Sequence, residues 1–486
     1  MKTKTCKIIT AVSLALVALF CASAGVSVLA AYSVFVNAGE DLMEIKKGST
    51  YAVGAAGSAI IREDDIYVLT AGGLEILGSS SGYIDGGYAG ELLDGGKSVR
   101  ISSSKVFVGL NYYYSPVRDT ALESVSLENA VGGGYKFGYF NDNRDFITTG
   151  YTDELRITMR IVSGTGIGVY ITGTEHLLFE MPMTNAKNML AIRPLCEQTD
   201  AVTWFDGHRY YGDFACAALG GGKITVVNAL DMEKYVMGVC AQEMGSLWPL
   251  EALKAQAVAA RTYAARCIKN SLYYETCGFD VTGDTYSQAY SGCDDVGDKI
   301  ESAVMETENE YLTWTGGLCD AQYFSSDGGA TEDIENVYGN SGHPYLRGVI
   351  DPYESAADSV NQYSKWSYTM TPSELGACAG LPDVERAEAE YSDTGNVISL
   401  TLTSSSGSRA VISKGNCRTA LGLPSIRYSV EKNSAGDFVF SGSGWGHNVG
   451  MSQFGAYSMA LYYNKTYRDI LNFYYTGVRV SYGIVG

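Results

Sequence analysis

Alternating apolar and polar positions recur along the first two hundred residues and predict short β-strands. The alternation is clearest in the segments 66–70, 99–110 and 155–178, where β-branched side chains are frequent. Pairs and triplets of glycine separate these segments, as expected for turns. We therefore predict small β-rich modules at residues 40–95 and 97–200. They show no repeat and no catalytic signature, so a binding or spacer role is the default interpretation.

The pattern changes after the glycine triplet at 220–222. Residues 223–228 predict a strand, and Asp231 is placed to cap a helix that runs through Val239. Residues 248–269 are rich in alanine and repeat apolar positions every three or four residues, which predicts the strongest helix of the chain. The predicted inner face of that helix carries Leu250, Leu253, Ala257 and Ala260 or Ala264.

The N-terminal segment has the pattern of an export signal. Lys2, Lys4 and Lys7 precede an almost charge-free run from residue 8 to residue 38. Because basic flanks stay in the cytoplasm, the remainder of the chain is predicted to lie outside it. Two clusters of small residues offer cleavage sites, yet residues 8–31 make 24 positions, enough to span a bilayer. Residues 1–31 are thus either a signal peptide or a membrane anchor, with a slight preference for an anchor.

The charge of the chain narrows the possible partners. Acidic residues outnumber basic ones, 54 to 35, and give a net charge of −19. This charge argues against nucleic acid, whose binding needs a cationic face, and against electrostatic docking on anionic lipid. The 36 tyrosines suit a sugar ligand, because a tyrosine ring can lie on the apolar face of a sugar while its hydroxyl stays polar. The surface of a secreted β-rich protein is the alternative explanation of this excess.

Six sequence blocks follow one another after residue 226 in a recognisable order. Three of them occupy residues 227–235, 238–244 and 248–263. They are followed by Q-x-Y-x-G at 288–292, S-x-x-G-G-x-T-E at 325–332 and W-G-H-x-V-G-M-S-Q at 445–453. Together the blocks resemble the stage II sporulation protein D (SpoIID)/LytB family. The resemblance covers residues 203–486.

The resemblance implies both a fold and an activity. The fold is an α+β catalytic domain at residues 203–486, with helices packed on antiparallel sheet. The activity is that of a lytic transglycosylase, which cleaves the glycan strands of peptidoglycan and leaves 1,6-anhydro ends. The residue that matches the family's single catalytic glutamate is Glu243. A role in sporulation and engulfment is a further implication, and the preceding β-rich modules would then bind the wall or act as spacers.

The chemistry is consistent with one carboxyl group at position 243. Cleavage of a glycosidic bond needs a proton on the leaving oxygen, and hydrolases usually add a second carboxylate. A lytic transglycosylase replaces water by the 6-hydroxyl of the sugar, so one residue can act first as acid and then as base. Apolar neighbours such as Val239, Met244 and Trp248 favour the neutral acid if Glu243 is buried. Taken alone, a glutamate at a helix end is more often a cap or an ion-pair partner.

Other residues of the blocks are predicted to line a sugar-binding groove with Glu243. They are Gln288, Tyr290, Ser325, Ser326, Gly328, Gly329, Thr331, Trp445, His447 and Gln453. The glycines permit close approach of backbone to ligand, and the hydroxyl and amide groups suit the N-acetyl and hydroxyl groups of sugars. Two members have equally weighted alternatives, Tyr290 as a core residue and His447 as a loop brace. We expect Glu243 and His447 to face one groove.

Four details depart from the family pattern or bear on it. Some members carry a zinc site of His and Cys before the Q-x-Y element, but residues 277–287 hold one cysteine and no histidine. Four ligands cannot be gathered there, so we predict no metal and no other cofactor. Asn448 replaces a glycine, and asparagine is the next best residue at positive φ. Asp327 adds a charge that we expect to affect substrate preference, and Cys277 and Cys293 are hypothesised to be bridged.

Two other classes of function are weighed against the enzyme. The first is a non-catalytic module that binds cell wall and enhances a separate amidase, a role that is also attached to this family. The second is a structural surface protein, which the ordered motifs disfavour. As an enzyme, the chain is expected to act on glycan strands that a partner amidase has stripped of stem peptides. The expected location is extracytoplasmic, either anchored in the cell membrane by the N-terminal segment or secreted to the cell wall.

Overall fold

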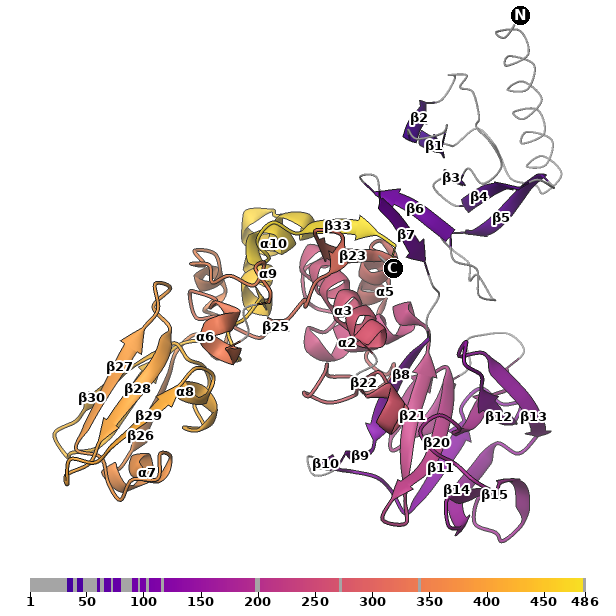
Figure 1. The fold of residues 1–486 in the computed structure, drawn as a ribbon, viewed down its shortest axis with the longest axis horizontal. Helices are drawn as coiled ribbons and strands as arrows, with labels where there is room; N and C mark the ends of the chain where they lie inside the picture. Colours follow the sequence, from indigo (N-terminus) through magenta and orange to yellow (C-terminus); the bar gives the residue numbers. More distant parts are fainter. Residues whose placement is uncertain are drawn as a thin grey trace, which may run out of the picture. The chain divides into compact units, whose positions relative to one another are not determined.

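In a computed structural model, the chain forms two compact units, Met1–Ser104 with Tyr482–Gly486, and Lys105–Ser481 (Figure 1). Side chains are described at residues 105–114, 118–196, 202–219, 221–270, 273–339 and 342–483. Before residue 105 the structure describes only the backbone of strands β1 to β7. The predicted signal peptide or anchor lies outside the described residues. In the described part of the chain, no helix is both long and apolar enough to span a bilayer.

The first unit contains antiparallel strands. They are β1 (Ser33–Asn37), β2 (Leu42–Lys46), β3 (Ala59–Ile61), β4 (Asp65–Thr70), β5 (Gly73–Ser79), β6 (Gly90–Asp94) and β7 (Lys97–Ile101). β1 pairs with β2, β3 to β5 form one sheet, and β6 pairs with β7. The alternation at residues 66–70 falls on β4, so the β-rich character that it predicts is confirmed.

Two larger sheets begin the second unit. The seven-stranded sheet has the order β13-β12-β17-β20-β21-β8-β22, and the six-stranded sheet has the order β16-β15-β14-β11-β18-β19. Their strands are β8 (Val106–Asn111), β11 (Ser124–Asn129), β12 (Tyr135–Phe140), β13 (Phe146–Thr152), β14 (Arg156–Ser163), β15 (Gly166–Ile171), β16 (Leu177–Met181), β17 (Leu190–Pro194), β18 (Val202–Phe205), β19 (His208–Tyr211), β20 (Asp213–Gly220), β21 (Lys223–Leu230) and β22 (Val281–Thr282). All pairs are antiparallel except β22 with β8. A short pair, β9 (Tyr113–Tyr114) and β10 (Arg118–Asp119), adjoins them.

The two sheets pack against each other through aromatic side chains. Phe205 of β18 contacts Phe214 of β20 with 5.7 Å between ring centroids, and Phe137 of β12 stacks on Phe179 of β16 at 5.3 Å. Strands from before and after residue 200 share both sheets, since β8 pairs with β21 and β11 pairs with β18. The predicted boundary at 200–203 therefore runs through the sheets, because strands on each side of it depend on the other side for hydrogen-bond partners.

Helices pack around one central helix, α3 (Leu250–Asn270), which contacts α2, α5, α9 and α10. The remaining helices are α2 (Met232–Glu243), α4 (Tyr274–Cys277), α5 (Asp298–Met305), α6 (Ile334–Tyr338), the 3-10 helix η2 (Glu354–Ala357), α7 (Pro372–Ala377), α8 (Asn416–Thr419), α9 (Gln453–Tyr463) and α10 (Tyr467–Tyr474). Because α3 has neighbours on several sides, Ala252, Ala255 and Ala259 are as buried as Leu253. Alanine keeps the helix axes close on all of these sides.

Smaller strand groups complete the α+β fold that the sequence predicts. β26 (Trp366–Met370), β31 (Phe438–Gly442) and β30 (Tyr428–Lys432) form one sheet, and β27 (Arg386–Tyr391), β28 (Val397–Thr403) and β29 (Arg409–Ser413) form another. β24 (Gly317–Leu318), β23 (Glu310–Trp314) and β33 (Arg479–Tyr482) form a third. A short parallel pair joins β25 (Tyr323–Phe324) to β32 (Met451–Ser452). This pair brings together two of the motif blocks.

Candidate active site

Glu243 is the last residue of α2, and its carboxylate accepts hydrogen bonds from three segments that are distant in sequence. The Ala289 amide donates to Oε1 at 3.0 Å, and the Tyr323 hydroxyl donates to the same oxygen at 3.4 Å. The side-chain amide of Gln453 donates to Oε2 at 3.1 Å. Asp231 occupies the N-cap position of α2 as predicted, but its side chain makes no capping hydrogen bond, and the helix continues past Val239 to carry Glu243. The fold therefore gathers three motif blocks around one carboxyl group.

Burial dominates the electrostatics of Glu243. The residue is partly exposed, and the loss of water around its carboxyl raises the pKa above the ordinary glutamate value. The three hydrogen bonds oppose this shift, since they favour the charged form. Among the described residues, no cation pairs with Glu243. The ion-pair alternative therefore does not fit this glutamate, and its carboxyl group is suited to release and regain a proton.

The short β25–β32 pair positions two of the three donors. Tyr323 lies in β25 opposite Met451 of β32, and Gln453 follows β32 directly as the first residue of α9. Ser452 caps that helix, because its hydroxyl accepts from the Gly455 amide at 3.2 Å. Backbone pairing and a helix cap thus fix the side chains that contact Glu243.

Gln288 belongs to the hydrogen-bond network of Glu243. Its side chain is 2% exposed, donates to the Tyr235 hydroxyl at 3.0 Å and accepts from the Tyr323 hydroxyl at 2.8 Å. The single proton of the Tyr323 hydroxyl is therefore shared between Gln288, the nearer acceptor at 2.8 Å, and Glu243 at 3.4 Å. In this structure Gln288 orients another side chain rather than presenting its own amide to solvent.

Tyr290 lies in the core, which is the alternative that its sequence context allowed. Its hydroxyl donates to Asn228 at 2.7 Å, and its ring contacts that of Tyr235 at 5.3 Å. A Cβ atom on Gly238 would lie 2.5 Å from the Tyr290 ring. Gly238 is thus required for Tyr290 to pack directly against α2, and this contact holds the Q-x-Y block beside Glu243.

His447 braces the segment that carries Tyr323. The Val449 amide donates to Nδ1 at 3.1 Å, so the ring proton is on Nε2, which donates to the Tyr323 carbonyl at 3.0 Å. Burial lowers the pKa of His447 to about 4, with a smaller contribution from the Arg418 charge. His447 is therefore neutral near pH 7 and is linked to Glu243 through Tyr323.

The other predicted groove residues divide by exposure. Trp445 is 39% exposed, and Ser325 is partly exposed with a hydroxyl that has no hydrogen-bond partner among the described residues. Ser326 and Thr331 are fully buried; the Ser326 hydroxyl donates to Glu354 at 2.6 Å, and the Thr331 hydroxyl accepts from the Val349 amide at 2.9 Å. Ser326 and Thr331 therefore hold the loop together in this structure.

The glycine-rich loops use the left-handed backbone region that the sequence suggests. Gly328 and Gly329 have φ values of 66° and 117°, and Asn448 has a φ of 63°. The prediction that Asn448 tolerates positive φ is confirmed. Its side-chain amide also donates to the Asp327 carbonyl at 3.1 Å, so asparagine adds a bond between the two loops that glycine would lack.

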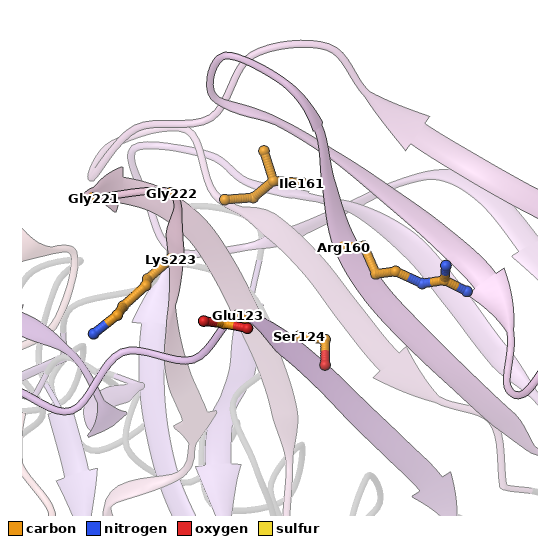
Figure 2. Close-up of a pocket in the computed structure, with 7 residues that line it drawn as sticks. All are labelled: Glu123, Ser124, Arg160, Ile161, Gly221, Gly222 and Lys223. Atoms are coloured by element: carbon orange, nitrogen blue, oxygen red, sulfur yellow. The ribbon is translucent and has the colours of Figure 1, made fainter.

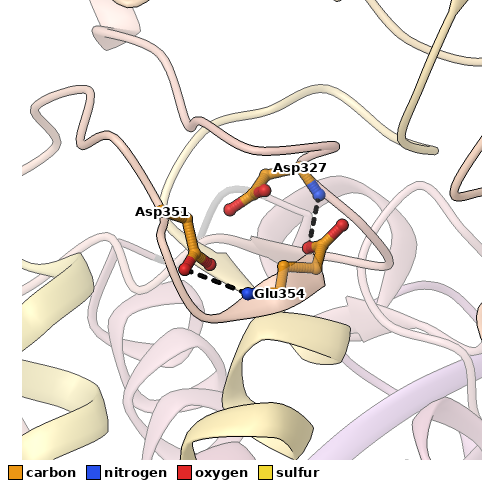
Figure 3. Close-up of side chains that lie close together, drawn as sticks. All are labelled: Asp327, Asp351 and Glu354. Atoms are coloured by element: carbon orange, nitrogen blue, oxygen red, sulfur yellow. Dashed lines mark hydrogen bonds between the residues drawn. The ribbon is translucent and has the colours of Figure 1, made fainter. Parts of the chain in front are cut away.

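Asp327, Asp351 and Glu354 form a buried carboxylate cluster beneath these loops (Figure 3). Glu354 accepts four hydrogen bonds, from the Ser326 and Ser452 hydroxyls and the Asp327 and Gly328 amides. A carboxylate has about four lone-pair sites, so these four hydrogen bonds fill the acceptor capacity of Glu354. The cluster thereby connects the S-x-x-G-G block to the residue that caps α9.

Asp327 is the member of the cluster with an unsatisfied oxygen. Its Oδ1 accepts from the Gly329 amide at 2.6 Å, but among the described residues Oδ2 has no hydrogen-bond donor. Burial, followed by the Glu354 and Asp351 charges, raises the pKa of Asp327 well above the ordinary value. A hard cation could also bind carboxylates, yet Ca²⁺ takes six or more oxygens and Glu354 has none to spare. A proton on Asp327, donated to Asp351, gives the unsatisfied oxygen a hydrogen-bond partner without the additional oxygen ligands that a cation would need.

Asp327→Asn is expected to leave stability at pH 7 unchanged or to raise it by about 1 to 3 kcal/mol. Asparagine keeps the acceptor for Gly329 and supplies a permanent donor to Asp351. In the parent chain, Asp327 stabilises the fold at pH values below the pKa that this group has in the unfolded chain. This stabilisation is lost as the pH rises through the higher pKa that the group has in the folded chain. Urea unfolding from pH 5 to pH 9 should show this decline in the parent and not in the variant. A loss of stability in the variant at every pH would contradict a protonated Asp327.

Gln453→Met tests whether a neighbouring side chain sets the pKa of Glu243. The change keeps the size of the side chain and removes a donor that favours the charged carboxylate, so the pKa of Glu243 should rise. We expect a rate of glycan cleavage about tenfold lower, and a fall in rate at high pH that begins at a higher pH than in the parent. Initial rates across a pH series measure both effects. A pH profile like that of the parent would show that Gln453 does not affect the pKa of Glu243.

Cys277 and Cys293 are both unbridged. Cys277 is buried, Cys293 is partly exposed, and neither is bonded to the other or to any described cysteine. The hypothesised bridge between them is absent from this structure.

A shallow hollow lies elsewhere, between strands that make no contact with Glu243. Its lining residues are Glu123, Ser124, Arg160, Ile161, Gly221, Gly222 and Lys223 (Figure 2). Arg160 pairs with Glu175, and Lys223 pairs with Asp119. Both cations are already partnered, and we assign no function to this hollow.

Sequence reasoning missed three contributors to the site. The Ala289 amide could not be found from residue type, because a backbone group does not depend on the side chain at its position. Tyr323 stands two residues before the S-x-x-G-G-x-T-E block, and the spacing gives no sign that its hydroxyl reaches Glu243. Glu354 lies outside every motif, and only the folded loop shows that it organises the Asp327 and Ser452 segments.

Comparisons with known proteins identify the family of the chain. The sequence profile of the family described as stage II sporulation protein matches residues 220–314. An uncharacterised protein of Brachyspira hyodysenteriae is 37% identical over 296 residues, which are 58% of this chain and 75% of that protein. Stage II sporulation protein D of Bacillus subtilis is 32% identical over 268 residues, 52% of this chain and 76% of that protein. The amidase enhancer of Bacillus subtilis is 27% identical over 292 residues, 50% of this chain and 40% of that protein. The chain belongs to the SpoIID/LytB family.

Proposed function

We propose that the chain is a lytic transglycosylase that cleaves the glycan strands of peptidoglycan and forms 1,6-anhydro ends. The observation that carries the proposal is the Glu243 carboxyl group, which is partly exposed, held by uncharged donors and raised in pKa by burial. Family membership supports a cell-wall function in sporulation, since two relatives are named stage II sporulation protein D and amidase enhancer.

The reaction needs one residue for two proton transfers. Protonated Glu243 gives its proton to the oxygen between two sugars, the bond from that oxygen to C1 breaks, and positive charge develops on the ring. The 6-hydroxyl of the same sugar then attacks C1 and gives its proton to the Glu243 carboxylate, which restores the acid. Between these steps the Ala289 and Gln453 donors stabilise the carboxylate. No water is activated, so a second carboxylate is unnecessary.

The charge of the chain bears on the form of the substrate. Stem peptides carry acidic groups, and a chain of net charge −19 would repel them. We therefore propose that the substrate is glycan already stripped of stem peptides by an amidase. The N-terminal export pattern supports action outside the cytoplasm, with the chain either anchored in the membrane or secreted to the wall.

A non-catalytic amidase enhancer is the second candidate function. This function is favoured by the similarity to a protein named amidase enhancer and by the β-sheets that precede the site in the sequence. In that case the Glu243 region would bind glycan without cleaving it, and the amidase that this chain stimulates would perform the hydrolysis.

The two candidates are separated by one assay. The purified chain is incubated with glycan strands that either retain or lack stem peptides, and products are identified by mass spectrometry. Anhydro-ended fragments from stripped strands are expected. A chain that releases no fragments from either substrate, but accelerates a separate amidase on whole wall, would be an enhancer and not a lytic transglycosylase.

A further inference from the structure

An aromatic group lies next to the residues that contact Glu243. Trp248 stands in the turn after α2, and its ring contacts Phe454 at 5.2 Å and Tyr457 at 5.3 Å between centroids. Phe454 directly follows Gln453, which donates to Glu243. All three aromatic residues are partly exposed. We name them the first platform.

A second aromatic group is attached to the S-x-x-G-G block. The indole of Trp445 stacks on the Tyr363 ring with 4.4 Å between centroids and 29° between planes. Trp445 stays 39% exposed despite this stack. Its backbone exchanges two hydrogen bonds with Ser326, at 3.0 and 2.8 Å. We name the Trp445–Tyr363 pair the second platform.

One short segment connects both platforms to Glu243. The Tyr323 hydroxyl contacts the carboxylate, the Ser325 carbonyl accepts from the Phe454 amide at 2.9 Å, and Ser326 pairs with Trp445. From residue 323 to residue 326 an extended chain spans at most about 10 Å. The Ser325 hydroxyl, between the two attachments, is partly exposed and has no protein partner among the described residues.

We propose that the two platforms stack on successive sugars of one glycan strand and hold it across Glu243, so that cleavage occurs within strands rather than at their ends. The inference rests on the proposed function and extends it to the mode of binding. Sugar rings of N-acetylated amino-sugar strands have an apolar face that suits an aromatic ring, and their hydroxyl edges suit Ser325. An acidic chain has little use of charge for holding such a strand, so stacking carries the affinity. Two partly exposed aromatic groups, both joined by short chain segments to residues that contact one carboxyl, favour a ligand longer than a single disaccharide.

Binding is tested in the Glu243→Gln background, where the strand stays intact. Trp445→Ala and Trp248→Ala are each expected to raise the dissociation constant of long stripped strands about tenfold, measured by isothermal titration. Trp445→Phe retains an aromatic ring and should recover part of the affinity. Tyr391→Ala is the matched control, because Tyr391 is 47% exposed but lies in β27, outside both platforms. Thermal unfolding of each variant identifies any that fail to fold.

The product sizes provide the second readout. With Glu243 intact, early products should be fragments of intermediate length, and early release of disaccharides from strand ends would overturn the proposal. Unchanged glycan binding in both folded tryptophan variants would also overturn the proposal. If these variants bind glycan normally but no longer stimulate an amidase, the aromatic surface is a protein-docking site and the proposal is wrong. Absence of cleavage with platform-dependent binding would instead contradict the catalytic proposal alone.

Discussion

Glu243→Gln is expected to lower the rate of glycan-strand cleavage about a thousandfold, within the 10²–10⁴ range of general acid–base catalysis. Glutamine keeps the oxygen that accepts from Ala289, and its size matches, but it has no proton to deliver at any accessible pH. Initial rates on stripped strands measure the change. The matched control is Glu301→Gln on the exposed face of α5, which should cleave like the parent.

The same substitution should not weaken the fold. Because burial raises the pKa of Glu243, ionising this group in the folded chain costs free energy. The contribution of Glu243 to stability is present at pH values below its pKa in the unfolded chain. It is lost as the pH rises through its higher pKa in the folded chain. Glu243→Gln is therefore expected to be as stable as the parent at pH 7, or more stable. A variant that unfolds would contradict this stability prediction, and a folded variant that retains more than a tenth of the parent rate would remove Glu243 from the role of acid.

Glu354→Ala is expected to lower the free energy of unfolding by about 3 to 5 kcal/mol, the scale for breaking a buried charged network. The substitution leaves the Ser326 and Ser452 hydroxyls and two backbone amides without their acceptor. Ser452 also caps α9, whose first residue contacts Glu243. Cleavage should therefore decline as well, although Glu354 does not touch the carboxyl group.

Urea unfolding at fixed pH measures this loss, and Asp327→Asn is its control within the same cluster. The two substitutions should differ in sign, because Glu354 accepts four hydrogen bonds while one oxygen of Asp327 has no donor among the described residues. A loss below about 1 kcal/mol for Glu354→Ala, the scale of one ordinary hydrogen bond, would show that the cluster does not organise the loops.

The sequence predicts the local elements well where periodicity is strong. The alanine-rich segment forms α3, the segment after the glycine triplet forms β21, and Asp231 occupies the N-cap of α2. The sequence predicts one inner face for α3, whereas the helix is buried on most sides. A single amphipathic pattern cannot show this, since alanine is compatible with both a buried and an exposed face.

Long-range pairing is the part that the sequence could not supply. Nothing in β8 indicates that it pairs with β21, more than a hundred residues later, so the predicted boundary near residue 200 crosses a sheet. The same limit applies at the site, where the motifs identify Glu243 and Gln453 but not the Ala289 amide. Side-chain identity carries no information about which backbone amides a fold will direct at a carboxylate.

The central claim is that one carboxyl group cuts the glycan and closes the ring without water. The most direct measurement is cleavage of stripped strands in water enriched in the heavy oxygen isotope, with mass spectrometry of the new ends. The account predicts ends that lack one water and carry no isotope label, and their loss in Glu243→Gln. Labelled reducing ends would show that water attacks C1, and the single-carboxyl mechanism would then be wrong.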